Sequence, residues 1–244
     1  GIGDGTNALA ITASQTDGAG NTGSDTAQAD KDATAPSVTI DAPAAVNGAN
    51  EGAYDVTGSC TSADGDVTVA ITGASPASQA VSCTADVFTA SFDVSGITDG
   101  VNALNISASQ TDGAGNTGND TAQADKDTTA PVVTLNALAD ATLSNQANYS
   151  LGGSCESAEG NVTVAITGAS PASQAVSCTA NAFSASFDVS GIADGVNALS
   201  ISASQADAGG NTGSDSAQAD KDAAAPIVTL NEPADATLSN QASY

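Results

Sequence analysis

A stretch of 95 residues recurs along this sequence without a gap. When residues 33–127 are aligned with residues 128–222, 66 of the 95 positions carry the same residue. Residues 1–32 match the last third of this unit, and residues 223–244 match its first 22 residues. A fixed period indicates one structural unit that is used several times. We therefore predict complete domains at 33–127 and 128–222, with the C-terminal fragment of a repeat at 1–32 and the N-terminal fragment of the next at 223–244.

The two ends of the sequence do not coincide with predicted domain boundaries. Residues 1–32 hold too little of a repeat to form a domain alone, and residues 223–244 lack the strands that would follow them. The sequence also contains no Met, no recognisable signal peptide and no run approaching the roughly 20 apolar residues of a membrane span. We therefore expect the natural chain to be longer, with any export signal outside this stretch.

Apolar and polar residues alternate in short runs throughout each repeat. In the run 66–73, Val67, Val69 and Ile71 fall on one face of an extended chain, which is the period-two pattern of a half-buried strand. Clusters of Gly, Asp, Ser and Pro separate the runs and indicate turns. In the first complete repeat the predicted strands are residues 36–40, 53–60, 66–73, 79–85, 87–94, 102–109 and 118–125.

Seven short strands in a 95-residue unit predict an all-β fold. The specific prediction is a series of tandem immunoglobulin-like, seven-stranded β-sandwich domains in a linear, rod-like array. The core of each domain is thin, and its aromatic members in the first repeat are Tyr54, Phe88 and Phe92. A small core of this kind usually needs support from a disulfide, a metal or neighbouring domains.

The charge of the chain is strongly one-sided. Three Lys or Arg residues stand against 28 Asp or Glu residues, and the formal net charge is -25. Nucleic acids and anionic membranes are poor partners for such a chain, because they bind clustered cations. The sequence has no His and one Lys in each repeat, so we predict that it is not an enzyme. Lys126 lies between two aspartates at a strand end, which favours a solvated ion pair over an isopeptide bond to asparagine.

Each complete repeat contains two cysteines that are 23 residues apart, and the fragments contain none. This pattern predicts one bridge inside each repeat, Cys60–Cys83 and Cys155–Cys178. Zinc is a poor alternative, because two thiols without His do not complete a tetrahedral site. A bridge closing such a loop would stabilise the domain by roughly 3 kcal/mol. Disulfides persist in oxidising surroundings, so we expect an extracellular location.

Most acidic residues fall in turns, where Asp and Gly are common for reasons that require no metal. In a seven-stranded sandwich, however, the loop 97–102 and the strand end 124–127 share one end of the domain, and head-to-tail stacking would bring them to the next repeat. Crowded carboxylates repel unless a cation neutralises them, and calcium binds six to eight oxygen ligands. We therefore predict interdomain calcium sites, with the turn role as the alternative for each single residue. The predicted groups are Asp4, Asp30 and Asp32 facing Asp112, Asp64 and Asp66 at the first joint, and Asp99, Asp125 and Asp127 facing Asp207, Glu156 and Glu159 at the central joint.

Two short motifs carry a resemblance to a known family. The sequence "DGAGN" (112–116), followed by a short strand and "DKDTTAP" (125–131), resembles the Ig-like repeats of very large bacterial surface adhesins of the type I-secreted, RTX-related kind. Two features depart from that family: paired cysteines are uncommon in its repeats, and no "GGxGxD" motif occurs here. The resemblance implies a secreted stalk of tandem domains that calcium stiffens at the joints.

The predicted function is therefore a non-catalytic structural stalk, or extender, of a long extracellular bacterial adhesin, rigidified by interdomain calcium and intradomain disulfides. Its partners would be the neighbouring repeats of the same chain. A sugar-binding module is a weaker alternative, because the aromatic residues alternate as core residues and do not form a platform. A self-assembling extracellular filament or surface sheath is the other alternative, with further copies of the chain as partners. Images of the native object would distinguish a beaded strand from a bundled lattice.

Overall fold

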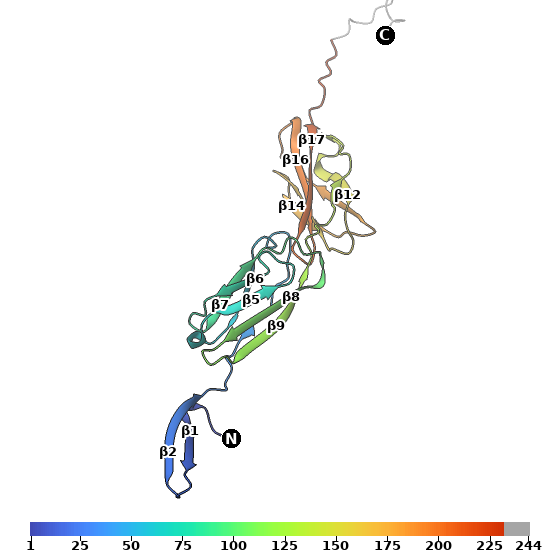
Figure 1. The fold of residues 1–244 in the computed structure, drawn as a ribbon. Helices are drawn as coiled ribbons and strands as arrows, with labels where there is room; N and C mark the ends of the chain where they lie inside the picture. The colour runs from blue at the N-terminus through green and yellow to red at the C-terminus, as the bar shows by residue number, and fades with distance from the viewer. Residues whose placement is uncertain (232–244) are drawn as a thin grey trace, which may run out of the picture. The chain divides into compact units, whose positions relative to one another are not determined.

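A computed structural model describes residues 1–231 of the chain, so the predicted fragment at 223–244 lies mostly outside the described residues. The chain divides into two compact units. The first comprises Gly1–Thr129 together with Ala208–Asn211, and the second comprises Ala130–Asp207 and the chain from Thr212 onward. The regular secondary structure of both units is almost entirely β-strand, which confirms the predicted all-β fold (Figure 1).

In the first unit, residues 33–127 form short strands where the alternating runs predicted them. The hydrophobic alternation places every second side chain toward the core, and the Gly- and Asp-rich segments form the turns. The strands are β3 (Thr39–Ile40), β4 (Tyr54–Ser59), β5 (Val67–Ile71), β6 (Ser78–Val81), β7 (Val87–Phe92), β8 (Gly100–Thr111) and β9 (Thr117–Lys126), with a 3-10 turn, η1 (Ser62–Asp64), after β4.

These strands form two sheets. One sheet has the order β3-β4-β7 and the other has the order β6-β5-β8-β9, and all neighbouring strands within them are antiparallel. The long hairpin β8–β9 pairs Thr111 with Thr117 at its turn and Gly100 with Lys126 at its open end. The open end therefore places the loop before β8 beside the end of β9, as the sequence predicted.

The repeat 128–222 has the same architecture with one additional short strand. Its sheets have the orders β10-β12-β15 and β11-β17-β16-β13-β14. The added strand β11 runs parallel to β17, whereas the corresponding Val46 of the first repeat makes an isolated bridge to Lys126. The elements are β10 (Thr134–Leu135), β11 (Ala141–Thr142), η2 (Gln146–Asn148), β12 (Tyr149–Ser154), β13 (Val162–Ile166), β14 (Ser173–Val176), β15 (Ala182–Phe187), β16 (Gly195–Ala206) and β17 (Thr212–Asp222).

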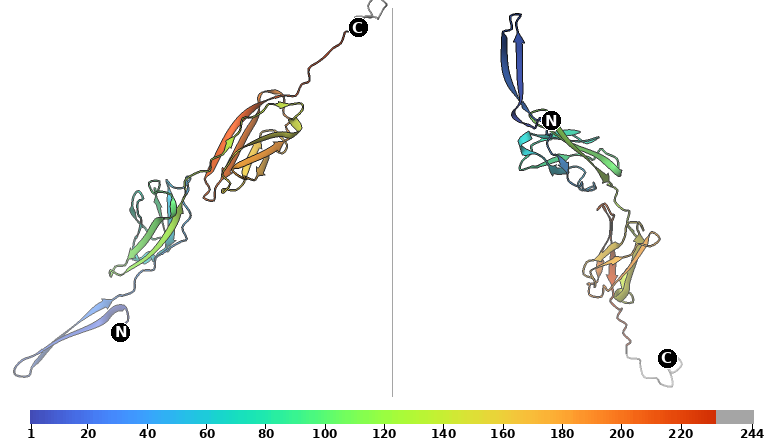
Figure 2. Two further views of the ribbon diagram at one scale, coloured as in Figure 1. Left: turned by 90° about the vertical axis from the view of Figure 1, so that its right-hand side faces the viewer. Right: turned by 90° about the horizontal axis from the view of Figure 1, so that it is seen from below.

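The core of each repeat lies between its two sheets, in a sandwich-like arrangement that Figure 2 shows from two further sides. Tyr54, Phe88 and Phe92 are each at most 2% exposed, which confirms their predicted place in the core. The ring of Phe88 lies directly over Gly58, where an added Cβ would come within 2.6 Å of ring carbons and 2.0 Å of the Thr39 carbonyl oxygen. The aromatic ring therefore fits only because position 58 has no side chain.

The chain before the first repeat forms a two-stranded hairpin of β1 (Gly5–Thr16) and β2 (Thr22–Lys31). This hairpin corresponds to β8–β9 in sequence and has the same register. Its apolar side chains are much less covered, and Ile11 is 53% exposed.

Both predicted disulfides are present in the structure. The S–S distances are 1.98 Å for Cys60–Cys83 and 2.02 Å for Cys155–Cys178, and no cysteine is free in the described part of the chain. Cys60 directly follows β4 in one sheet, while Cys83 lies two residues beyond β6 in the other, so its predicted place within the fourth strand is wrong. Each bridge therefore links the two sheets of its repeat.

Candidate functional site

The lysine at the end of β9 points into the protein. Inward and outward positions alternate along β9, and Lys126 occupies an inward position two residues after the buried Ala124. The residue is 4% exposed, although lysine is almost never fully buried unless its charge is paired. The sequence predicted that this lysine would lie in solvent, and that prediction is wrong. The strand alternation places the ammonium group at the edge of the core, where it is buried.

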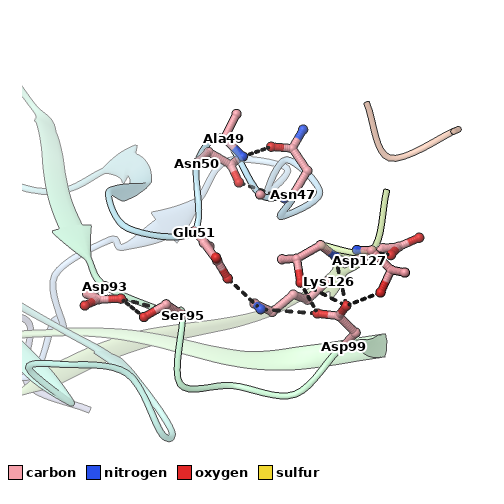
Figure 3. Close-up of polar contacts among 12 residues, drawn as sticks. Asn47, Ala49, Asn50, Glu51, Asp93, Ser95, Asp99, Lys126 and Asp127 are labelled. Carbon is pink, nitrogen blue, oxygen red and sulfur yellow. Dashed lines mark hydrogen bonds and ion pairs between the residues drawn. The ribbon is translucent and has the colours of Figure 1, made fainter. Parts of the chain in front are cut away.

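Two carboxylates surround the Lys126 ammonium group. Its Nζ donates to Glu51 Oε2 at 2.9 Å and to Asp99 Oδ1 at 3.2 Å, and Figure 3 shows it between the two. Glu51 belongs to the loop before β4, and Asp99 belongs to the loop before β8. The cluster thus joins three segments at one end of the repeat, and we call it the lysine cluster (Glu51, Asp99 and Lys126).

Asp99 is also held by the residues that follow β9. Its Oδ2 accepts the Thr128 amide N–H at 2.9 Å and the Thr128 hydroxyl at 3.0 Å. The Thr128 amide, followed by the hydrogen bond from Lys126, keeps the pKa of Asp99 below its usual range. Burial acts to lower the pKa of Lys126, but the hydrogen bonds that Lys126 donates to Glu51 and Asp99 outweigh it and raise this pKa. Both shifts favour the charged pair.

The same lysine position recurs in the other copies with different surroundings. In the second repeat Lys221 Nζ contacts Asp194 at 2.6 Å, and position 146, which aligns with Glu51, is Gln. In the hairpin β1–β2, Lys31 pairs with Asp4, and both side chains are 32% exposed. The Lys31 hydrogen bond is the main reason that the pKa of Asp4 falls to about 2.

Two of the predicted calcium ligands each support a bulge in their own hairpin. Asp125 Oδ1 accepts the Asn102 amide at 2.7 Å, and Asp30 Oδ1 accepts the Asn7 amide at 2.8 Å. Asn102 and Asn7 have φ of 51° and 55°, in the left-handed region that Asn tolerates better than most residues. These aspartates therefore stabilise an unusual backbone conformation where the register of the hairpin shifts.

The remaining predicted ligands also have structural contacts. Asp127 and Asp32 each accept the amide of the residue two positions later, at 3.0 and 3.1 Å. Asp112 Oδ1 accepts the amides of Ala114 and Asn116 at 2.9 Å, and its Oδ2 accepts the Asn116 side-chain amide at 2.8 Å. The Asn116 side chain is the main cause of the lowered pKa of Asp112. Asp207 occupies the corresponding position directly after β16.

A buried glutamine holds the other acidic loop, and the sequence analysis missed it. Gln110 is 1% exposed, and its side chain bonds the Thr61 amide and carbonyl at 3.0 and 2.8 Å and the Gly65 carbonyl at 2.8 Å. Gln205 makes the corresponding bonds to Glu156 and Gly160. The sequence did contain a signal for this buried residue, because Gln110 falls at an inward-facing position of a strand with alternating apolar residues. The loop that carries Asp64 and Asp66 is therefore fixed by its own domain.

The structure brings Asp99, Asp125 and Asp127 to one end of the first repeat, because Gly100 pairs with Lys126. Within residues 1–231, however, no group of three or more His, Cys, Asp or Glu side chains is arranged to hold a metal ion. The oxygens at this end are hard ligands of the kind that calcium prefers, but a complete coordination shell would need further oxygens. None of the helical segments in the described residues is long and apolar enough to span a membrane.

No protein-family model matches the sequence, and no characterised protein sequence matches it significantly. Among solved structures, it is similar to a Ca²⁺-stabilized adhesin with which an Antarctic bacterium binds ice, at 26% identity and a TM-score of 0.48 over 90% of this chain and 58% of that chain. It is also similar to a 1.5-MDa bacterial ice-binding adhesin, at 21% identity and a TM-score of 0.44 over 88% of this chain and 74% of that chain. A third similar structure is the tetra-tandem repeat in the extending region of a large adhesion protein, at 24% identity and a TM-score of 0.33 over 88% of this chain and 56% of that chain. All three TM-scores lie below 0.5, so we infer neither the fold nor the function of this chain from these similarities.

Proposed function

We propose that this chain is a non-catalytic extender region of a long extracellular bacterial adhesin. The observation that carries the proposal is the gap-free 95-residue period, in which two successive repeats share seven corresponding strands, the same inter-sheet disulfide and the same buried aromatic core. Repetition of one stable unit adds length to a chain. In such a unit most residues maintain the fold of the repeat. We propose Ig-like domains at 33–127 and 128–222, flanked by repeat fragments at 1–32 and 223–244.

The finer parts of the proposal come from the sequence motifs. The "DGAGN" and "DKDTTAP" segments resemble those of type I-secreted, RTX-related adhesins, so we propose the same export class and a location at the cell surface. The disulfides support an oxidising, extracellular environment. The partners in this proposal are the neighbouring repeats of the same chain.

Calcium is the proposed cofactor at the joints between repeats. The ligands would be Asp4, Asp30 and Asp32 with Asp112 at the first joint, and Asp99, Asp125 and Asp127 with Asp207 at the central joint. Several of these carboxylates already accept hydrogen bonds from backbone amides of other residues in the same chain. An ionised carboxylate has about four lone-pair sites, so such a group can also bind a cation. The intramolecular hydrogen bonds would then hold the ligands in place before calcium arrives.

Calcium would act by changing the stiffness of the joints. The linker "DKDTTAP" is short, and its Pro131 restricts the preceding residue to extended conformations. The net charge of -25 produces repulsion between repeats, which a bound divalent cation would relieve. Calcium-loaded joints would therefore hold the repeats in an extended array, and calcium-free joints would bend.

Small-angle scattering and thermal unfolding of the chain with calcium or with a chelator test this proposal. We expect chelation to reduce the maximum dimension and to lower the melting temperature. Magnesium at matched ionic strength is the control, because general charge screening would act similarly for both ions. Replacing Asp125 and Asp127 together by Asn should remove the response to calcium at the central joint. Identical scattering and melting curves with calcium and with the chelator would overturn the calcium proposal.

The extender role has its own test, because a filament or sheath requires association between chains. We expect the chain to sediment as a monomer over a wide concentration range with calcium present. Concentration-dependent lateral assembly, visible as bundles in electron micrographs, would instead support the filament.

A further inference from the structure

The first and last parts of each repeat lie side by side and run in the same direction. In the first repeat, Val46 forms a parallel bridge with Lys126. The Val46 amide donates to the Asp125 carbonyl at 2.9 Å, and the Asp127 amide donates to the Val46 carbonyl at 2.9 Å. The Val46 side chain is fully buried, so this contact also closes the edge of the core. We call it the terminal pair (Val46 with Asp125, Lys126 and Asp127).

The second repeat contains the same contact in a longer form. Its β11 runs parallel to β17, with Ala141 opposite Lys221 and Thr142 opposite Asp222. Ala141 aligns with Val46 and is also fully buried. The parallel contact is therefore a property of the repeat and not of one copy of its sequence.

The parallel direction determines how the terminal pair responds to tension. A pull on the N-terminal side of the repeat reaches Val46 from the segment before it, and a pull on the C-terminal side reaches β9 from the segment after it. Because the two segments run in the same direction, these opposite pulls slide one segment along the other. Hydrogen bonds between strands run across the strands, so sliding strains both bonds of the pair at once.

Neighbouring contacts hold the terminal pair against this sliding motion. The Tyr54 hydroxyl donates to the Ala44 carbonyl at 2.7 Å, two residues before Val46, and the Tyr54 side chain lies in the core. Farther upstream, β3 pairs only two residues with β4. We therefore expect β3 to detach first under tension, after which the terminal pair and the Tyr54 hydrogen bond resist the pull.

The disulfide limits how far the repeat can extend once the terminal pair has opened. It joins the end of β4 to the segment before β7, so β5 and β6 lie inside a closed loop that tension does not reach. Cys60 and Cys83 are 23 residues apart, and their Cα atoms are separated by 6.0 Å. An extended chain spans about 3.3–3.6 Å per residue, so the closed loop withholds about 70–80 Å from the extension of an unfolded repeat.

We propose that each complete repeat bears tension, with the terminal pair as its mechanical clamp and the disulfide as the limit of its extension. This inference rests on the proposed extender function, because a stalk that is held at both ends transmits a pull through every repeat. It requires no calcium, since the hydrogen bonds of the clamp are formed by the chain itself.

Force-clamp measurements on single molecules of the 244-residue chain, held by its two ends in a chelator, test the proposal. We expect one unfolding step from each complete repeat. A reductant added after unfolding should release a further step of about 70–80 Å for each disulfide. Absence of this further step would overturn the role of the disulfide. Replacing Cys155 and Cys178 by Ser identifies the first repeat, because its step is then the shorter one.

Matched variants at one exposed position test the clamp. Asp127→Pro removes the amide that donates to Val46, whereas Asp127→Ala keeps this amide and loses only the carboxylate. Asp127 directly follows the last residue of β9, so neither change alters the core. At constant force we expect the first repeat to unfold about fivefold faster in Asp127→Pro, as the loss of one hydrogen bond predicts, and at the parent rate in Asp127→Ala. Equal unfolding rates in the two variants would overturn the clamp.

A variant inside the closed loop provides a second control. Val81 belongs to β6 and packs against the core. Val81→Ala should lower the melting temperature and leave the unfolding rate under force unchanged, because its contacts break only after the terminal pair has opened. A faster rate under force in this variant would overturn the assignment of the resistance to the terminal pair. Lateral assembly during sedimentation would instead contradict the extender function, so the two failures are distinguishable.

Discussion

The hairpins 5–31 and 100–126 are nearly the same sequence in two different environments. They differ at only four of 27 positions, and their strands pair in the same register around the same turn. In both turns an aspartate, Asp17 or Asp112, accepts backbone amides of its own loop. The pairing and the turn are therefore local properties of the sequence.

Burial is what separates the two hairpins. Ile106 is 2% exposed in the first repeat, whereas the corresponding Ile11 is 53% exposed. The lysine side chain at the open end is 3% exposed at position 126 and 32% exposed at position 31. The other strands of the repeat supply this cover and turn a regular hairpin into part of a core.

Removal of a core side chain should show the largest difference between the hairpins. We expect Ile106→Ala to destabilise the first repeat by about 2–5 kcal/mol, because it removes buried methyl groups and leaves a cavity. Ile11→Ala is the matched control and should change stability little. Hydrogen exchange of peptides from 100–126 measures the effect separately for this repeat. Equal losses of protection in the two variants would contradict the importance of the covering sheet.

The glycine after each turn should show the next largest difference. An added Cβ at Gly118 would come within 1.9 Å of the Pro36 carbonyl oxygen, whereas Gly23 has nothing within 4 Å. We expect Gly118→Ala to cost about 1–3 kcal/mol, as overpacking does, because the segment before β3 that carries Pro36 must move. Gly23→Ala should be nearly neutral in the same exchange measurement. A neutral Gly118→Ala would show that the segment carrying Pro36 does not lie against β9 in solution.

The strands, turns and disulfides were predictable because local patterns determine them. Alternation in the run 66–73 places Val67, Val69 and Ile71 inward wherever the strand pairs, and all three are fully buried. The spacing of Cys60 and Cys83 within one repeat was enough to pair them. The short parallel strand β11 carries no such pattern, because two residues are too few to show a period.

The candidate site was less predictable, because its properties depend on contacts between distant segments. Nothing near Lys126 in the sequence shows that Glu51, 75 residues away, completes its surroundings. The buried Gln110 likewise acquires its role only when the loop after β4 lies beside β8. The sequence correctly placed Asp99, Asp125 and Asp127 at one end of the first repeat. Calcium binding there stays a prediction.

Asp4 and Asp99, which pair with these lysines, should have lowered pKa values for different reasons. This is the smallest difference that we expect between the hairpins. The hydrogen bond from Lys31 is the main cause of the low pKa of Asp4, whereas the Thr128 amide is the main cause for Asp99. Lys31→Met should therefore raise the pKa of Asp4 from about 2 toward its usual value, and Lys126→Met should leave the pKa of Asp99 still lowered.

Carboxyl ¹³C NMR titrations of the two variants measure both pKa values. A carboxyl group with a lowered folded pKa stabilises the protein above its unfolded pKa of about 4, and this contribution is lost as the pH falls through the folded pKa. The first repeat of Lys126→Met should therefore still lose stability below about pH 4, because the Thr128 amide still holds the Asp99 carboxylate. A normal Asp99 pKa in that variant would show that the buried lysine, and not the backbone, fixes the charge at this end of the repeat.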